Sequence, residues 1–365
     1  MIGNGNQPLQ LFEKSYCKHI RICYSRAKSQ MQQQINQRKG TKVMIKLGMV
    51  GAGGIGIWHK EALDRLNLYS LEAVCDIVID RAKDIACGTN ARVYADYKEM
   101  AEAEKLDAVI LNLPHFLHKE VAVYFLERSI AVLVEKPMAM NVEECNAMIE
   151  ASRKTNTPLA VGHVQRYFVG FRKLKEIVES GELGEFCQMT EIRNVNYFDE
   201  ARPTWFLDKA KAGAGITMNY GAHGLDKLKY ITGATIEKVT AIGSNTLNSE
   251  NIEACSQLLL KLSGNASAIL SYCGCNVPAT EELTLYFTKG SAKLNPNSEL
   301  QRELYISKEG APYEKIELPY EKDLCFMDSQ LEEFYKLLKG EKSDVVTPEY
   351  GRDIIRVLED AISQF

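Results

Sequence analysis

The 365-residue sequence predicts an α/β protein with two main domains: an N-terminal doubly wound parallel sheet and a C-terminal α+β domain with a large, mostly antiparallel open sheet. Three observations support this prediction. A glycine-rich turn joins a buried strand to a helix near residue 50. Strand and helix patterns then alternate as far as residue 162, as in a parallel sheet that is covered on both faces. Beyond it, long consecutive strands follow with few helices, which is typical of an antiparallel sheet.

The glycine-rich turn has the spacing of a dinucleotide-binding site. An aliphatic run over residues 43–50 is followed by Gly51, Gly53 and Gly56 in the order G-x-G-x-x-G. Gly51 permits the tight turn, Gly53 lets a pyrophosphate approach the backbone, and Gly56 lets the next helix lie close to the strand. That helix would direct its free N–H groups at the phosphates.

Asp76 supplies the acid that such a site needs. It lies 20 residues beyond Gly56, at the expected end of the second strand, where it can accept both ribose hydroxyls of an adenosine. Ile77 and Val78 follow it, rather than Ser or Arg. Because a carboxylate repels a 2′-phosphate and no adjacent cation replaces it, we expect NAD rather than NADP as the cofactor.

The rest of this NAD-binding Rossmann domain, residues 43–163, follows from aliphatic runs and the turn residues between them. Further strands are expected at 92–94, 106–113, 129–134 and 157–162, and helices at 81–87, 97–104, 118–128 and 142–155. Asn141 is the expected N-cap of the last helix, with two acids in its first turn.

A substrate and oligomerisation domain is expected over residues 164–324. Its helices are predicted at 171–180 and 221–230, and its strands at 185–197, 239–243, 257–262, 266–272, 282–287 and 300–306. Two C-terminal helices in residues 325–365, at 325–338 and 348–363, are long enough to return and brace the first domain. An open sheet with helices on one face needs cover on the other, so we expect a homo-oligomer formed through this sheet.

Composition excludes several classes of protein. The net charge of −4 gives no field for binding nucleic acid or a membrane, and no apolar run approaches about 18 residues. The ten cysteines show no paired C-x-x-C spacing, which indicates reduced thiols and a cytoplasmic location. Cys273 and Cys275 could form a metal or redox pair, but alternation along a strand explains them better, so no metal site is predicted.

Residues 1–42 form a basic extension, with eight Lys or Arg and the single acid Glu13. It could be a helical arm that contacts a neighbouring subunit or an anionic partner. It could also be dispensable, because Met44 is a natural start for the domain that follows.

Lys136 is the strongest candidate for a catalytic residue. It lies just past the carboxyl end of a central strand, the edge at which open α/β sheets bind ligands. Pro137 fixes the turn, as a catalytic ammonium requires. A surface lysine paired with Glu135 is the alternative.

Asn219 and His223 form the second candidate. They are four residues apart, so at the start of a helix they share one face, and a glycine-rich loop at 213–215 precedes them. A histidine there could take the proton of a substrate hydroxyl while hydride leaves the same carbon.

Over residues 44–365, these motifs together resemble the family of glucose–fructose oxidoreductase, inositol dehydrogenase and MocA, which are NAD(P)-dependent enzymes. Five segments carry the resemblance: Gly51-Ala52-Gly53-Gly54-Ile55-Gly56 with Asp76, Leu113-Pro114-His115-Phe116-Leu117-His118, Glu135-Lys136-Pro137, Gly162-His163 with Arg166-Tyr167, and Gly213 to Asp226. The resemblance implies cofactor contacts from the first three segments, including Gly54, Ile55, Leu113, Pro114, His118, Glu135 and Lys136. It implies a substrate pocket lined by Lys136, His163, Arg166, Tyr167, Asn219, Tyr220 and His223.

Two departures from the family pattern stand out. The family has aspartate where this chain has Asn219, and an amide orients the histidine without adding charge, so the base would be weaker or Lys136 would share the proton. The family's Trp-Arg pair reads Trp205-Phe206, which removes a cation from the pocket and argues against phosphorylated or carboxylated substrates. Trp205, Phe206, Tyr167 or Tyr220 could stack on a sugar ring.

The predicted function is an NAD-dependent sugar or glycoside dehydrogenase that oxidises a secondary ring hydroxyl, with ring position 3 favoured. Lys136 would hold the substrate oxygen, His223 would be the acid and base, and Asn219 would orient it. Two alternatives stay open: a redox-assisted glycoside hydrolase with Tyr220 or His163 as a second base, and a non-catalytic regulator that binds NAD and sugar.

Overall fold

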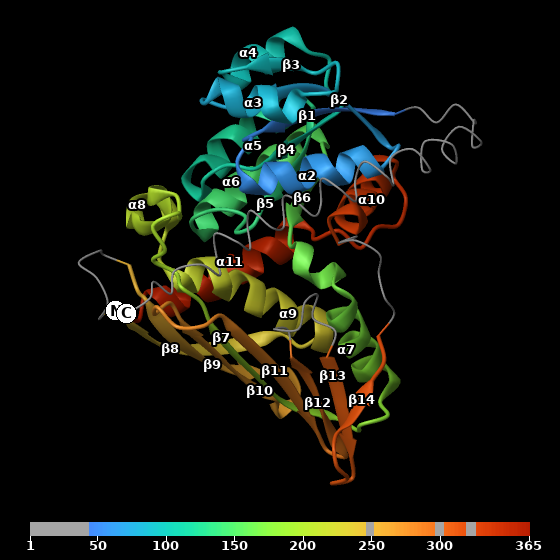
Figure 1. The fold of residues 1–365 in the computed structure, drawn as a ribbon, viewed down its shortest axis with the longest axis vertical. Helices are drawn as coiled ribbons and strands as arrows, with labels where there is room; N and C mark the ends of the chain where they lie inside the picture. The colour runs from blue at the N-terminus through green and yellow to red at the C-terminus, as the bar shows by residue number, and fades with distance from the viewer. Residues whose placement is uncertain (1–43, 246–251, 296–302, 319–325) are drawn as a thin grey trace, which may run out of the picture. The chain divides into compact units, whose positions relative to one another are not determined.

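The structure is a computed structural model that describes residues 44–245, 252–295, 303–318 and 326–365 (Figure 1). The predicted extension of residues 1–42 and the first part of the predicted strand at 300–306 lie outside the described residues.

The first sheet has six parallel strands, as the sequence predicts, and their order is β3-β2-β1-β4-β5-β6 (Figure 1). The order reverses between β1 and β4, which places a ligand-binding crevice at their carboxyl ends. The strands are β1 Ile45–Val50, β2 Tyr69–Cys75, β3 Arg92–Tyr94, β4 Ala108–Leu111, β5 Ala131–Glu135 and β6 Leu159–Gly162.

Two apolar layers cover this sheet. One contains Leu47 and Met49 of β1 and extends to α2, α3 and α10, while the other contains Val50 and extends to α5 and α6. The helices are α2 Gly54–Arg65, α3 Ile79–Ala86, α4 Tyr97–Ala103, α5 His118–Leu126 and α6 Val142–Thr155. Asn141 caps α6 as predicted, since its side chain accepts a hydrogen bond from the Glu144 N–H at 2.9 Å.

The second sheet has eight strands in the order β14-β13-β12-β11-β7-β10-β9-β8, and only the β7–β10 pair is parallel. A mostly antiparallel open sheet is therefore confirmed. The strands are β7 Phe186–Asn194, β8 Ile236–Ser244, β9 Cys255–Leu262, β10 Ser267–Cys273, β11 Thr280–Phe287, β12 Gly290–Asn295, β13 Glu303–Lys308 and β14 Glu314–Ile316. Strands β12 and β14 were not predicted.

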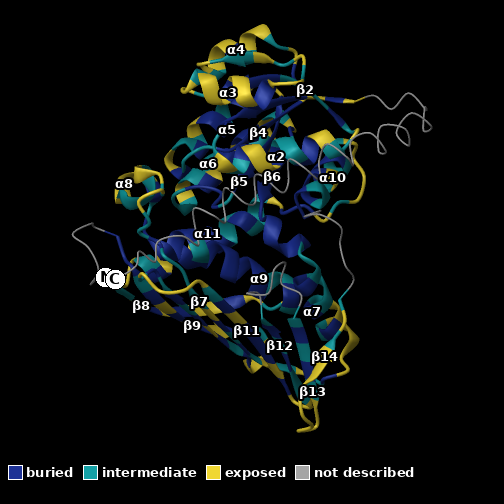
Figure 2. Cartoon of the chain, viewed as in Figure 1, coloured by how far each residue is buried: buried dark blue, intermediate teal, exposed yellow. Residues whose placement is uncertain are grey.

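Helices cover the inner face of the second sheet. Figure 2 shows the mainly buried helix α9 (Ala222–Thr232) and the partly buried helix α11 (Pro348–Ile362) along it, with α7 (Val169–Ser180) beside them. The two C-terminal helices also contact the first domain: α11 packs on α6, and α10 (Phe326–Leu338) packs on α2. Arg65 of α2 donates to both carboxylate oxygens of Asp328 on α10.

The outer face of the second sheet carries exposed apolar side chains. Ile242 of β8 is 67% exposed and Leu259 of β9 is 54% exposed, and Ile192, Ile269 and Tyr286 add to the surface. Among the helices that the structure describes, none is long and apolar enough to cross a bilayer.

Candidate functional site

The fold requires two of the glycines in the turn after β1, each for a different physical reason. Gly51 has a φ of +97°, and a Cβ there would lie 2.3 Å from the Asn112 carbonyl oxygen. A Cβ on Gly56 would lie 2.7 Å from the Gly51 carbonyl oxygen, so α2 could not approach the strand. At Gly53, in contrast, a Cβ would meet nothing within 4 Å. Gly53 therefore borders open space beside the helix end.

The N-terminus of α2 is suited to an anion. Its N-cap is Gly53, with no side-chain cap and no acid in the first turn, so its free N–H groups have positive potential and no competing carboxylate. Asp76 lies beside this turn, where its Oδ2 accepts from the Ala52 N–H and its Oδ1 from the Val78 N–H, both at 2.7 Å. Each carboxylate oxygen keeps a lone pair for a ribose hydroxyl.

The helix N-terminus and Asp76 therefore fit the pyrophosphate and the ribose of NAD, respectively.

Two turns at the carboxyl ends of β4 and β5 are joined by His118. Its Nδ1 lies 2.9 Å from the Pro137 carbonyl oxygen and its Nε2 lies 2.8 Å from the Leu113 carbonyl oxygen. The ring is fully buried, and desolvation lowers its pKa. With both ring nitrogens facing backbone carbonyls, His118 holds the two turns together, and its predicted contact with the cofactor stays a prediction.

Glu135 is buried at the end of β5. Its Oε1 lies 2.9 Å from Nε2 of His59, a fully buried residue of α2, and its Oε2 accepts from the Lys136 N–H at 3.3 Å. Glu135 thus connects the turn after β5 to the helix that follows the glycines. The sequence analysis did not single out His59, because nothing local to it indicates a partner 76 residues away.

Lys136 reaches from the first domain to the second. Its Nζ donates to Asn219 Oδ1 at 2.6 Å and lies 3.3 Å from the Asn219 carbonyl oxygen. Desolvation lowers the pKa of this lysine to about 7, with Arg193 and Arg202 lowering it further against the opposing effect of Glu135. Near neutral pH, the amine can therefore exist in both protonation states.

Asn219 lies on a π-helical segment, Thr217–Gly221, that leads into α9. The sequence predicted an ordinary helix from residue 221, and π-helical turns are frequent at functional sites. The carboxylate of Glu253 holds the start of this segment, since it accepts from the Gly215 N–H at 2.8 Å and from the Thr217 N–H at 2.7 Å. Glu253 was not predicted as a site residue.

His223 lies on α9, four residues after Asn219. Its side chain is buried, and its Nδ1 has no hydrogen-bond partner within the part of the chain that the structure describes. Desolvation lowers its pKa well below the ordinary value, and the nearby charge of Lys136 lowers it further. The ring is therefore neutral near pH 7. The structure brings Lys136, Asn219 and His223 together, which is what one shared active site requires.

Three further predicted substrate residues are buried: Arg166 pairs with Asp226 and Tyr167 packs in the apolar core, whereas Nδ1 of His163 has no hydrogen-bond partner among the described residues. Arg166 donates to Asp226 in a buried ion pair, and desolvation lowers the pKa of His163, whose Nδ1 lies 3.9 Å from Asp226 Oδ2, to about 4. Tyr167 is buried in the apolar layer that includes Phe326 of α10. Direct substrate contacts from His163, Arg166 and Tyr167 stay predictions.

The aromatic segment Thr204–Leu207 contacts the first domain. Trp205 and Phe206 stack with ring centroids 3.8 Å apart, and the His115 and Trp205 rings meet edge to face with their centroids 4.8 Å apart. Nδ1 of His115 lies 3.1 Å from the Ala212 carbonyl oxygen. This segment therefore lies beside the loop that follows β4.

Two arginines bear on the charge argument made from the sequence. Arg193 lies with its guanidinium 4.2 Å from the ring of Tyr220, and Arg202 lies 4.1 Å from the ring of Tyr197. Both lower the pKa of Lys136, so both are close enough to act on the site. Arg193 is also paired with Glu281, since their nearest nitrogen and oxygen lie 3.5 Å apart, so the expectation about anionic substrates stays a prediction. The position of Arg202, three residues before Trp205, was the available signal.

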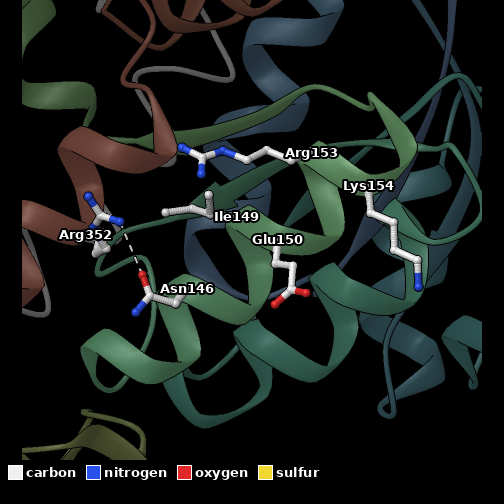
Figure 3. Close-up of a pocket in the computed structure, with 6 residues that line it drawn as sticks. All are labelled: Asn146, Ile149, Glu150, Arg153, Lys154 and Arg352. Carbon is white, nitrogen blue, oxygen red and sulfur yellow. Dashed lines mark hydrogen bonds between the residues drawn. The ribbon is translucent and has the colours of Figure 1, made fainter.

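A separate hollow lies between α6 and α11 (Figure 3). It is lined by Asn146, Ile149, Glu150, Arg153, Lys154 and Arg352, and Arg352 donates to Asn146 Oδ1 at 3.3 Å. None of the predicted site residues lines it.

Comparisons with known proteins find relatives of part of the sequence and solved structures with the same fold. A myo-inositol 2-dehydrogenase of Thermotoga maritima is 30% identical over 207 residues, 56% of this chain and 60% of that protein, so the chain aligns with less than two thirds of its length. An oxidoreductase domain protein from Kribbella flavida shares the fold with a TM-score of 0.80 at 20% identity, over 88% of this chain and 96% of that one. A levoglucosan dehydrogenase in complex with NADH and L-sorbose gives a TM-score of 0.79 at 15% identity, with coverage of 88% and 96%.

Two family descriptions match successive parts of the sequence. Residues 45–163 match an oxidoreductase family with an NAD-binding Rossmann fold, and residues 171–293 match the C-terminal domain of the same family. The chain therefore belongs to the Gfo/Idh/MocA family of NAD-binding oxidoreductases.

Proposed function

We propose that this protein is an NAD-dependent dehydrogenase that moves a hydride between nicotinamide and a secondary hydroxyl or ketone of a sugar or glycoside, at ring position 3 in preference to others. The observation that carries the proposal is the hydrogen bond from Lys136 to Asn219, which joins the carboxyl edge of the first sheet to the π-helical segment before His223.

NAD would be held by this chain's own groups at that edge. The free N–H groups of α2 would bind the pyrophosphate, Gly53 would leave room for it, and Asp76 would accept the ribose hydroxyls. Bound there, NAD supplies the acceptor for the hydride.

The proton of the substrate hydroxyl has two candidate acceptors. His223 is neutral but has a pKa well below its ordinary value, so it is a weak base, whereas Lys136 has a pKa of about 7. A general base works best when its pKa lies near the working pH, which favours the neutral amine of Lys136 as the acceptor. His223 would orient the hydroxyl, and Asn219 holds the lysine in place through the bond at 2.6 Å.

The names of relatives favour a polyhydroxylated substrate. One relative is named a myo-inositol 2-dehydrogenase and one fold neighbour a levoglucosan dehydrogenase. Aromatic faces at Trp205 and Phe206 would suit a sugar ring, which stacks on such surfaces.

A substrate panel tests the proposal. The purified protein is incubated with NAD and with inositols, pyranoses and nitrophenyl glycosides, while absorbance reports reduced nicotinamide and mass spectrometry reports loss of two hydrogens. Reduction of NAD by at least one compound is expected. Release of nitrophenol without net reduction would instead support the glycoside hydrolase, and binding without either reaction would support the regulator.

We also propose a homo-oligomer formed through the outer face of the second sheet. Ile242 and Leu259 are more than half exposed on that face, and Ile192, Ile269 and Tyr286 extend the apolar surface. Contiguous exposed apolar surface favours association, and a second copy of the same sheet would cover it.

A further inference from the structure

We propose that Cys255, Cys273 and Cys275 form a binding site for a thiophilic metal ion, with Zn²⁺ as the ion of first choice. The three Sγ atoms lie within 4.8 Å of one another. Cys255 Sγ lies 3.5 Å from Cys273 Sγ and 3.8 Å from Cys275 Sγ. Tetrahedral zinc with Zn–S bonds of about 2.3 Å separates its sulfurs by about 3.8 Å. The thiols are therefore already spaced as ligands of one ion.

The register of the second sheet brings these cysteines together. Cys255 begins β9 and faces Cys273 at the end of β10 across the antiparallel pair. The Gly274 N–H donates to the Ala254 carbonyl oxygen at 2.7 Å, so the two cysteines form a non-hydrogen-bonded pair, in which side chains approach closely. Cys275 follows just beyond the strand. The sequence analysis saw only Cys273 and Cys275, because Cys255 is separated from them by the whole β9–β10 hairpin.

The environment of the cluster favours a thiolate on Cys273. Burial raises the pKa of this thiol, but hydrogen bonds from the Cys275 backbone N–H and from the other two thiols outweigh that effect, and the net shift is downward. The hydrogen bond to Cys273 helps to raise the pKa of Cys275 to about 12. The three sulfurs already contact one another, and a cation that replaces thiol protons would be bound by all three.

In the single chain the thiols are reachable from solvent, at one end of the outer sheet face proposed above as the interface. All three residues are partly exposed, and Cys255 and Cys273 occupy the outward positions of their strands, since the residues next to them, Ser256 and Tyr272, are fully buried. Three protein thiolates leave one position of a tetrahedral ion to water or to a group from another molecule, as in zinc sites with an open position.

An ion at this site would stabilise the backbone that leads into the π-helical segment Thr217–Gly221 of the proposed active site. Cys255 follows Glu253, whose carboxylate holds the backbone N–H groups of Gly215 and Thr217 before Asn219. Gly274, between the other two ligands, accepts from the Tyr197 N–H at 3.1 Å. The metal would thus clamp two segments that contact the π-helical segment, while taking no part in hydride transfer.

Metal binding by the full-length protein tests the inference without reference to activity. The protein is reduced, stripped with a chelator under anaerobic conditions and titrated with Zn²⁺ against a chromophoric chelator, and with Co²⁺ to record thiolate charge-transfer absorption. One equivalent per chain is expected, with a Co²⁺ spectrum typical of several thiolate ligands. Cys273→Ser should weaken binding by more than about 100-fold, beyond the 10- to 100-fold that loss of an outer partner costs.

Cys187→Ser is the matched control, because Cys187 is an exposed thiol on β7 outside the cluster. It should bind Zn²⁺ as the unaltered chain does, and circular dichroism should show both variants folded. The inference is overturned if Cys273→Ser binds Zn²⁺ as tightly as the control, or if no charge-transfer absorption develops. A Cys255–Cys273 disulfide that survives treatment with the reductant would also overturn it.

Discussion

At the scale of single residues, Lys136 is the group whose protonation is most affected by burial in a way that could serve catalysis. Its amine lies between two domains, hydrogen-bonded to Asn219, and its pKa falls to about 7 mainly because it is desolvated. An amine with that pKa can accept a proton from an alcohol and return it to a ketone at physiological pH.

A pH profile follows from this assignment. Oxidation needs the neutral amine, so kcat/KM for the sugar should rise as the pH passes through about 7, and reduction of the ketone should fall over the same range because it needs the ammonium. Lys136→Arg keeps a cation that does not deprotonate and should lower the oxidation rate by about 100-fold or more. Oxidation that slows with rising pH would contradict the assignment of Lys136 as base.

Asp76 gives a prediction about the cofactor. Asp76→Ala should weaken NAD binding by about 1–3 kcal/mol, the cost of losing charge-assisted hydrogen bonds, as measured by calorimetry. Asp80→Ala removes an exposed acid of α3 that pairs with Lys83 and should leave NAD affinity unchanged. Equal affinities in the two variants would show that Asp76 does not hold the ribose.

At this scale, the sequence reveals residues that local motifs mark. It does not reveal side-chain pairs between residues that are distant in the sequence. Lys136, Asn219 and His223 follow local signals and do converge. Glu135 and Arg166 were expected to contact ligands, which stays a prediction, but their partners His59 and Asp226 were not foreseen. These pairs span 76 and 60 residues, so only the folded chain reveals them.

At the scale of elements, the glycines between β1 and α2 serve two purposes: packing of the helix on the strand, and space for a cofactor. Gly56 is needed for packing, because a Cβ would lie 2.7 Å from a backbone oxygen, whereas Gly53 is surrounded by open space. At Gly53, only the close approach of a bound cofactor would then require glycine.

Substitutions in the turn test this separation. Gly56→Ala should lower the free energy of unfolding by about 1–3 kcal/mol, as overpacking does. Gly53→Ala should leave the denaturation midpoint without NAD unchanged and should lose the stabilisation that added NAD gives the unaltered protein. If Gly53→Ala unfolds as readily as Gly56→Ala in the absence of NAD, the open space beside the helix is not a cofactor site.

Elements with strong periodicity were predictable, and short or unusual ones were not. The helix Val142–Thr155 has the predicted ends, since Asn141 caps its start and Asn156, in the left-handed conformation, ends it. Strand Glu314–Ile316 has three residues, too few to show alternation. The π-helical segment Thr217–Gly221 depends on Glu253, which holds its start from another part of the chain.

At the scale of the whole molecule, the proposed active site is assembled from both sheets. The first supplies Lys136 and the glycine turn, and the helix on the second supplies His223. The class of both sheets could be predicted from the succession of patterns. Which outer face would remain apolar could be inferred from alternation, but which charges collect at the domain boundary, such as Arg193 and Arg202, could not.

The outer face gives a prediction about assembly. Ile242→Lys combined with Leu259→Lys places two charges on the exposed sheet face and should reduce the mass measured by light scattering to that of a single chain. Val78→Lys alters an apolar residue that is 43% exposed in the other domain and should leave the mass unchanged. A double variant that keeps the mass of the unaltered protein would place the interface elsewhere.

The most direct measurement of the central claim compares Lys136→Met with the unaltered protein in two assays. In the first, NAD affinity is measured by calorimetry, and in the second, NAD reduction is followed with the best sugar of the panel. We predict equal affinities, because the glycine turn and Asp76 are intact, and loss of turnover by at least about 100-fold. Turnover by Lys136→Met at the rate of the unaltered protein would contradict the account.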